Sequence, residues 1–254
     1  MNALTIGTVR DLIAAHERAR PRSQQTAIGP SEIGGDCDRR LGYQIVGTPQ
    51  SNPATLPLAA WLGTGAHAAM AEAVTNDDDW IAEHKVTIPG SGHVTVDGQP
   101  ITGTLDAYHK PSRTVVDWKF VADTTITYAR RNQQPSPAYR TQVHCYAAGM
   151  IADGYPVDHV AVMFIPRSGR AANMHLWSEP YDPLVVVDAL DRLNRIRETA
   201  QTGDFAQLAT AAHFCATCPF MVPLITRLDE GCPGHPHTNP IDGMDTTTTR
   251  KAVT

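Results

Sequence analysis

A chain of 254 residues is long enough for one large domain with a small appendage, and its 42% hydrophobic content supports an ordinary buried core. The net charge of -5 argues against a histone-like protein that binds nucleic acid over its whole surface, although a local basic groove is compatible with an acidic total. No apolar stretch has the length of a membrane span, and the N-terminus lacks the basic-then-apolar order of a signal peptide, so we expect a cytoplasmic protein without membrane contacts.

The first third of the chain predicts helices. Residues 4–20 carry apolar side chains at helical spacing and end at Pro21, which predicts an amphipathic helix. A second helix is predicted to begin at Pro30, with the hydroxyl of Ser31 accepting a hydrogen bond from the first turn. An Ala-rich helix is predicted over 58–74, after the break at residues 53–57.

The middle of the chain predicts a sheet. Short β-type runs separated by Gly, Pro and Asp occupy residues 80–88, 93–96, 101–108, 114–119, 157–166 and 171–177. A polar, partly helical connection is predicted over 120–137, and helices over 138–153 and 181–202. The expected fold class is therefore α/β or α+β, a sheet flanked by helices, with a disordered Thr-rich tail after residue 236.

Two charged side chains at the end of one predicted strand indicate a candidate catalytic site. Because side chains alternate along a strand, Asp117 and Lys119 project to one face while Trp118 projects to the other. If Asp106 comes from a neighbouring strand, its carboxylate can share a divalent ion with Asp117, which leaves Lys119 to orient a water or stabilise phosphate charge. Glu83, on the preceding strand, is either an outer carboxylate of this site or an exposed surface residue.

The following helix adds two polar side chains on one face. Gln142 and Tyr146 are four residues apart, so they lie one above the other and can reach a phosphate, a base edge or the lysine. His67 lies in the Ala-rich helix, where a single histidine is either a metal ligand or a packed, hydrogen-bonded residue.

Five cysteines in a reducing compartment favour metal ligation or buried thiols over disulfides. Cys215 and Cys218 form a Cys-x-x-Cys pair, and Cys232 follows after thirteen residues. Cys37 is the candidate for a distant fourth ligand, because Cys145 lies inside the 138–153 helix and is expected to be a buried core thiol. By residue type alone, such a set suits structural zinc.

The order of these motifs resembles the RecB-like branch of the PD-(D/E)XK nucleases, and within it the CRISPR-associated Cas-four type exonucleases and their phage relatives. The similarity covers about residues 30 to 235 and rests on residues 62–67, 103–106, 117–119 and 142–146 taken in that order. It implies a restriction-endonuclease-like core with a central mixed sheet flanked by helices. It also implies a helical part held together by an iron-sulfur cluster.

The resemblance assigns roles to particular residues. His67, Asp106, Asp117 and the backbone carbonyl of Trp118 would bind Mg²⁺ or Mn²⁺. Lys119 would position the attacking water, and Gln142 and Tyr146 would hold the substrate or the lysine. The cysteines implied for a [4Fe-4S] cluster are Cys37, Cys215, Cys218 and Cys232, although the gap before Cys232 is longer than is usual in the family, and structural Zn²⁺ remains the alternative.

These assignments divide the chain into a helical segment at 1–56 that contributes one cluster cysteine, a nuclease core at 57–203, a cysteine-rich segment at 204–236 and a tail at 237–254. Five arginines flank the site in sequence and are candidates to contact substrate phosphates: Arg39, Arg40, Arg130, Arg131 and Arg140.

The expected function is a metal-dependent exonuclease that degrades single-stranded DNA ends, as a monomer or an oligomer. Two alternatives stay open at this point. One is a DNA-end-binding or CRISPR-adaptation-type subunit in which the nuclease fold serves mainly as a scaffold. The other is a zinc-organised DNA-binding protein without hydrolytic activity.

Overall fold

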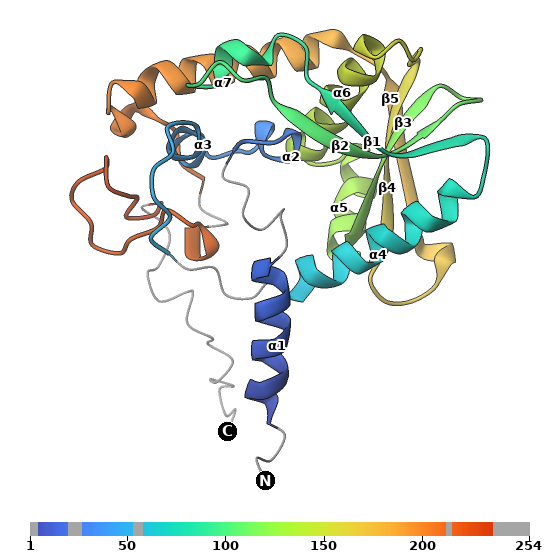
Figure 1. Cartoon of the computed structure of the whole chain (residues 1–254), viewed down its shortest axis with the longest axis horizontal. Helices are drawn as coiled ribbons and strands as arrows, with labels where there is room; N and C mark the ends of the chain where they lie inside the picture. Colours follow the sequence, from blue (N-terminus) through green and yellow to red (C-terminus); the bar gives the residue numbers. More distant parts are fainter. Residues whose placement is uncertain (1–4, 20–26, 53–57, 212–214, 236–254) are drawn as a thin grey trace.

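A mixed sheet of five strands forms the centre of the protein (Figure 1). The computed structural model describes residues 5–19, 27–52, 58–211 and 215–235. The strands lie side by side in chain order: β1 (Trp80–Thr87), β2 (Thr102–His109), β3 (Thr114–Val121), β4 (His159–Pro166) and β5 (His175–Pro180). The predicted α/β class, a central mixed sheet flanked by helices, is confirmed, and the arrangement is compatible with a restriction-endonuclease-like core.

The pair β3 and β4 is parallel, whereas the other neighbouring strands are antiparallel. A parallel pair requires a crossover connection, which is supplied here by α5 (Asp123–Asn132) and α6 (Pro137–Ala152). The α5 helix confirms the prediction of a partly helical connection. Because β3 and β4 are covered on both sides, their sequences are nearly continuous apolar runs, and Asp117 is a charged exception in β3.

The two faces of the sheet have separate hydrophobic cores. The larger core lies under α6 and includes Val162 and Phe164 of β4. The smaller one lies under α4 (Leu58–Thr75) and contains Val74 and Trp118. Helix α7 (Pro183–Gln201) begins at an Asp182 N-cap and packs against α6 and α3 (Asp38–Ile45) rather than forming a further layer on the sheet.

The N-terminal segment is fitted closely onto α6. Helix α2 (Pro30–Ile33) ends at Gly34, where a Cβ atom would lie 2.7 Å from the Ala138 Cα and 2.8 Å from the Thr141 Cβ. A contact this close excludes any side chain, so α2 and the first turns of α6 are in direct backbone contact.

Helix α1 (Ile6–Ala19) extends away from the rest of the described chain (Figure 1), and Ile6 and Leu12 on it are exposed. Its observed bounds agree with the predicted amphipathic helix. Within the described ranges, no helix combines the length and apolar character needed to cross a bilayer.

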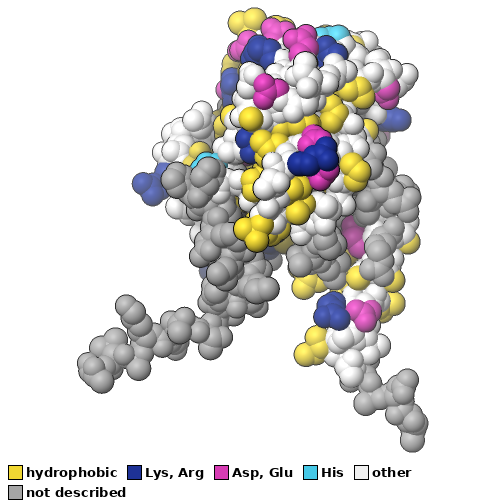
Figure 2. Space-filling view, turned by 90° about the vertical axis from the view of Figure 1, so that its left-hand side faces the viewer, with side chains coloured by type: hydrophobic (Ala, Val, Ile, Leu, Met, Phe, Trp, Pro, Cys, Tyr) yellow, Lys and Arg dark blue, Asp and Glu magenta, His cyan; other side chains and the backbone are white. Residues whose placement is uncertain are grey.

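After α7 the described chain consists mainly of turns and loops. It contains two short 3-10 helices, η4 (Phe205–Gln207) and η5 (Cys215–Thr217), and an isolated β-bridge between Met221 and Cys232. Tyr43 of α3 secures this segment, because its hydroxyl donates to the carbonyls of Leu228 and Gly231. Figure 2 looks onto this side of the molecule, where hydrophobic side chains gather around a small group of charged ones.

Three local predictions are wrong. Residues 93–96 form no strand, because Ser91–Val94 is a 3-10 turn between left-handed Gly90 and Gly98. The run at 171–177 becomes a strand only from His175, after the 3-10 turn Ala171–Asn173.

The third error concerns the start of α2, where Ser31 is not the cap. The N-cap is Gly29, whose amide donates to the Glu32 carboxylate at 2.8 Å. The predicted tail at 237–254 and the break at 53–57 lie outside the described residues.

Candidate functional site

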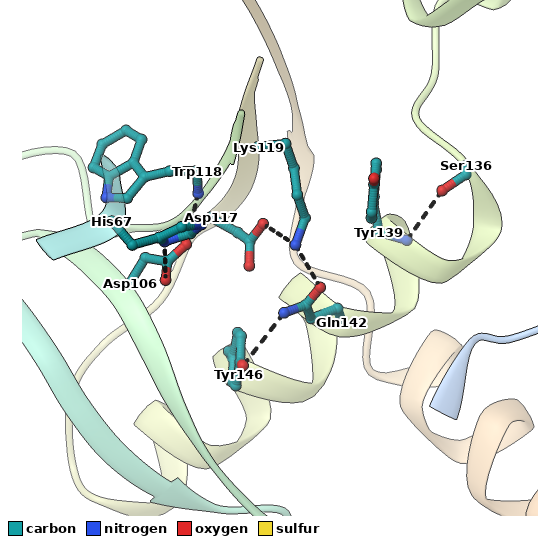
Figure 3. Close-up of polar contacts among 9 residues, drawn as sticks. All are labelled: His67, Asp106, Asp117, Trp118, Lys119, Ser136, Tyr139, Gln142 and Tyr146. Atoms are coloured by element: carbon teal, nitrogen blue, oxygen red, sulfur yellow. Dashed lines mark hydrogen bonds and ion pairs between the residues drawn. The ribbon is translucent and has the colours of Figure 1, made fainter. Parts of the chain in front are cut away.

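The end of β3 carries the centre of the site. Asp117 and Lys119 lie on one face of the strand, and the Lys119 Nζ is 2.7 Å from the Asp117 Oδ2 (Figure 3). The intervening Trp118 side chain packs on the opposite face, in the smaller core. The alternation expected from the sequence is therefore what places a carboxylate and an ammonium together.

Asp106 of β2 joins this pair because β2 and β3 separate at this point. Their antiparallel pairing runs from His109 opposite Thr114 to Ala107 opposite Val116 and stops there. Beyond this point the Asp106 carboxylate takes the place of a main-chain acceptor of β2. Its Oδ2 accepts a hydrogen bond from the Trp118 amide at 2.7 Å. This contact fixes one acid of the site against the strand that carries the other.

His67 of α4 reaches the same place from the smaller-core face. Its Nδ1 lies 3.1 Å from the Asp106 Oδ1, and this hydrogen bond raises the pKa of the imidazole (Figure 3). The Phe120 ring packs against the edge of the imidazole. His67, Asp106 and Asp117 come from three different elements but lie close enough for their charges to influence one another's pKa.

Burial makes Asp117 unusual. Only 1% of the residue is exposed, and this desolvation raises the pKa of its carboxyl to about 6, with the nearby Asp106 adding repulsion and Lys119 opposing the shift. The Asp117 Oδ2 lies 2.7 Å from the Lys119 ammonium and has no further hydrogen-bond donor among the described residues. A buried carboxylate oxygen whose one polar contact is an ammonium is an acceptor suited to a further cation.

Helix α6 holds the lysine. The Gln142 Oε1 accepts from the Lys119 Nζ at 2.8 Å, and the Gln142 Nε2 donates to the Tyr146 hydroxyl at 3.3 Å. The Lys119 ammonium also lies 4.7 Å from the centre of the Tyr139 ring. Gly103 of β2 makes room for Tyr146, since a Cβ atom there would lie 3.0 Å from the Tyr146 Cε1. Gln142 therefore contacts the lysine directly, and Tyr146 is connected to it through Gln142. Holding the lysine is one of the two roles considered from the sequence.

The contact of Tyr139 with Lys119 was not predicted from the sequence. The signal was present in the sequence, since residues 139, 142 and 146 follow helical spacing and share one face of α6.

The donor set fits a hard divalent cation in chemistry, with two carboxylates and one imidazole. Among the described side chains, however, no three His, Cys, Asp or Glu groups converge closely enough to hold a metal ion. His67 and Asp106 are hydrogen-bonded to each other, and the proton between them must leave before both can bind one ion. The Asp117 Oδ2 contacts the Lys119 ammonium, so an ion bound there would share this oxygen with the lysine or displace it.

The five predicted substrate arginines differ in their surroundings. Arg39 binds the carbonyls of Phe205 and Leu208, Arg130 those of Asn173 and Met174, and Arg140 the Glu179 carboxylate. These three guanidinium groups hold the protein's own elements together. Arg40 and Arg131 each line a hollow of the surface instead.

Four cysteines line one cavity of about 770 Å³ between the N-terminal segment, α6 and the cysteine-rich segment: Cys37, Cys215, Cys218 and Cys232. Two of their sulfurs accept main-chain hydrogen bonds, the Cys215 Sγ from His235 at 3.3 Å and the Cys232 Sγ from Gly234 at 3.4 Å. Arg39 lies 3.8 Å from the Cys232 Sγ.

Cys145 is fully buried in the larger core, and burial raises the pKa of its thiol to about 12. The prediction of a core thiol is confirmed.

No protein-family model matches the chain, and no curated protein matches its sequence significantly. Solved structures show a limited likeness. SSO0001 has a TM-score of 0.48 and 15% identity over 87% of this chain and 96% of that one. An alkaline exonuclease, LHK-Exo from Laribacter hongkongensis, has a TM-score of 0.48 and 11% identity over 71% of this chain and 91% of its own.

The complex of LHK-Exo with dAMP has a TM-score of 0.47 and 11% identity, over 70% of this chain and 89% of that one. Likeness at this level is too low to carry an argument about activity.

Proposed function

We propose that this protein is a metal-dependent deoxyribonuclease that hydrolyses phosphodiester bonds at the ends of single-stranded DNA. The observation that supports this best is the buried Asp117 carboxylate, which lies beside Asp106 and whose Oδ2 has no hydrogen-bond donor among the described residues other than the Lys119 ammonium. Burying two nearby acids destabilises a protein unless a cation compensates them, and such sites are typical of function rather than stability.

In this proposal His67, Asp106, Asp117 and the Trp118 carbonyl hold Mg²⁺ or Mn²⁺. The ion would lower the pKa of a bound water and neutralise charge on the phosphate. The protein's own part is to keep the site dry and to orient Lys119 toward the phosphate oxygens, where charge develops. Gln142 and the Tyr139 ring fix the position of the ammonium, and Tyr146 fixes Gln142.

The proposed contacts with the substrate are contacts with its phosphates. Arg40 and Arg131 are the proposed phosphate contacts, whereas Arg39, Arg130 and Arg140 are proposed to shape the surface through the main-chain and side-chain contacts already described. Contacts with phosphates carry no sequence information, so we expect cleavage with little sequence preference.

The four cavity cysteines are proposed to bind a [4Fe-4S] cluster, with structural Zn²⁺ as the alternative. The observation that supports this is that all four cysteines line the same cavity although they come from two distant parts of the chain. The four thiols line one cavity, so they could serve either a cluster or a single zinc ion, and the metal content of the purified protein distinguishes the two.

The proposed division of the chain is the one expected from the sequence. Residues 57–203 would form the nuclease core, residues 1–56 would supply Cys37, and residues 204–236 would supply the other three ligands.

The cluster is tested by its colour. Anaerobically purified protein should be brown, with broad visible absorption and about four iron atoms per chain. Cys37→Ser should lose most of the colour and iron, whereas Cys145→Ala should keep both because Cys145 is not among the residues that line the cavity. A colourless protein that contains one zinc ion per chain would establish the alternative.

The activity is tested on end-labelled single-stranded DNA with Mn²⁺ or Mg²⁺. We expect stepwise shortening from an end, no reaction in EDTA, and no reaction with circular single strands of the same sequence. Binding to ends without shortening would favour the scaffolding alternative. Equal cutting of linear and circular strands would show that ends are not required.

A further inference from the structure

The cavity that holds the four cysteines is also lined by two tyrosines from the nuclease side, Tyr128 of α5 and Tyr139 of α6. Tyr139 belongs to the proposed active site as well, because its ring lies 4.7 Å from the Lys119 Nζ. The cavity is therefore separated from the catalytic lysine by one aromatic ring. A nucleotide whose phosphate contacts Lys119 has its base within reach of this cavity.

The lining of the cavity suits a base better than a phosphate. Among the described residues that line it, the carboxylate and guanidinium side chains are Glu32, Asp36 and Arg40, with a net charge of -1. Glu32 already accepts a hydrogen bond from the Gly29 amide. Arg40 offers a phosphate the one guanidinium group among these side chains, whereas the apolar, aromatic part of the wall is favourable for the flat face of a nucleobase.

Tyr128 is an aromatic side chain of the cavity lining whose ring is open to solvent. It is 49% exposed, so its face is accessible to a ligand. It also lines a second hollow, of about 500 Å³, together with Arg131 and Thr127 of the same helix. One ring thus separates an apolar cavity from a polar hollow with a guanidinium group.

We propose that Tyr128 is a stacking platform for the nucleobase next to the scissile phosphate of single-stranded DNA, and that Arg131 contacts the following phosphate. This arrangement matches the general way in which single strands are bound without sequence preference, by an aromatic face for the base and a cation for the backbone. It rests on the proposed nuclease function and names how the same site holds its substrate. The stacking face explains how a base can be held while its identity is ignored.

The test uses the full chain, in Ca²⁺ without Mg²⁺ or Mn²⁺, and a single-stranded oligonucleotide with 2-aminopurine near one end. Wild type should quench the probe by stacking, and Tyr128→Ala should remove the quenching and weaken binding about 5- to 150-fold, the range expected for one base-aromatic stack. Tyr128→Phe should keep both. Val187→Ala, a change at an equally exposed side chain on α7, should have no effect.

A second measurement uses Mn²⁺ and an oligonucleotide with one abasic position. Digestion by wild type should pause where the missing base would stack on the Tyr128 ring, and Tyr128→Ala should remove the difference in rate between intact and abasic strands. If wild type digests both strands evenly, or Tyr128→Ala binds and quenches as wild type does, the stacking proposal is wrong while the nuclease proposal stands. If wild type neither binds nor degrades DNA, both are wrong.

Discussion

Replacing Asp117 by asparagine is expected to reduce metal-dependent cleavage of DNA at least about 1000-fold, because losing about 4 kcal/mol of transition-state stabilisation costs a factor of that size. Asparagine keeps the shape of the side chain but removes the charge that a divalent ion requires. Two measurements are needed. The initial rate on end-labelled single strands measures the loss of cleavage, and calorimetry measures the loss of Mn²⁺ affinity.

The matched control for this variant is Asp188→Asn, which makes the same change at an exposed position of α7. The control should bind Mn²⁺ and cleave as wild type does. Mn²⁺ affinity that is unchanged in Asp117→Asn would mean that the buried carboxylate is not a ligand, and the proposed metal site would have to be abandoned.

Replacing Lys119 by alanine is expected to lower the cleavage rate about 100- to 1000-fold while binding of Mn²⁺ and DNA persists, because the ammonium acts where charge develops and not as a ligand. Removing it also leaves the Asp117 carboxylate buried without its ion pair. The metal-free variant should therefore unfold at a lower temperature than wild type, and Mn²⁺ should restore more stability to the variant than it adds to wild type.

Lys85→Ala supplies the control, because Lys85 is an exposed lysine of β1 in the same sheet. Thermal unfolding with and without Mn²⁺ and single-turnover cleavage are the measurements. A Lys119→Ala protein that cleaves at the wild-type rate would refute the assigned role of the lysine, whatever its stability.

Much of the fold follows from local pattern. The alternation in β3, the Ala-rich composition of α4 and the helix-ending Gly154 after α6 were sufficient to place these elements within a few residues. The same alternation placed Asp117 and Lys119 on one face, and helical spacing placed Gln142 beneath Tyr146. These are short-range consequences of backbone geometry, so the sequence carries them directly.

The parts that the sequence did not predict depend on contacts between distant residues. The separation of β2 from β3 at Asp106, and the Asp106 contact with the Trp118 amide, require a side chain to replace a main-chain partner. Residues 93–96 have strand-like composition, but the two left-handed glycines around them set a turn. Tyr128 has no sequence neighbour that marks it, since its importance comes from the two hollows it borders.

The close packing of Gly34 against α6 connects the proposed cysteine-bound centre with the proposed catalytic site. Gly34 ends the short helix that leads to Cys37, and it touches the turn of α6 from which Tyr139 and Gln142 reach Lys119. Close-packed interiors transmit a displacement rather than absorb it. If a metal centre bound by the cysteines were gained or lost and the segment that carries Cys37 shifted, Gly34 would press on the first turns of α6. The positions of Tyr139 and Gln142, and with them the position of the Lys119 ammonium, would then depend on the state of the cysteine site.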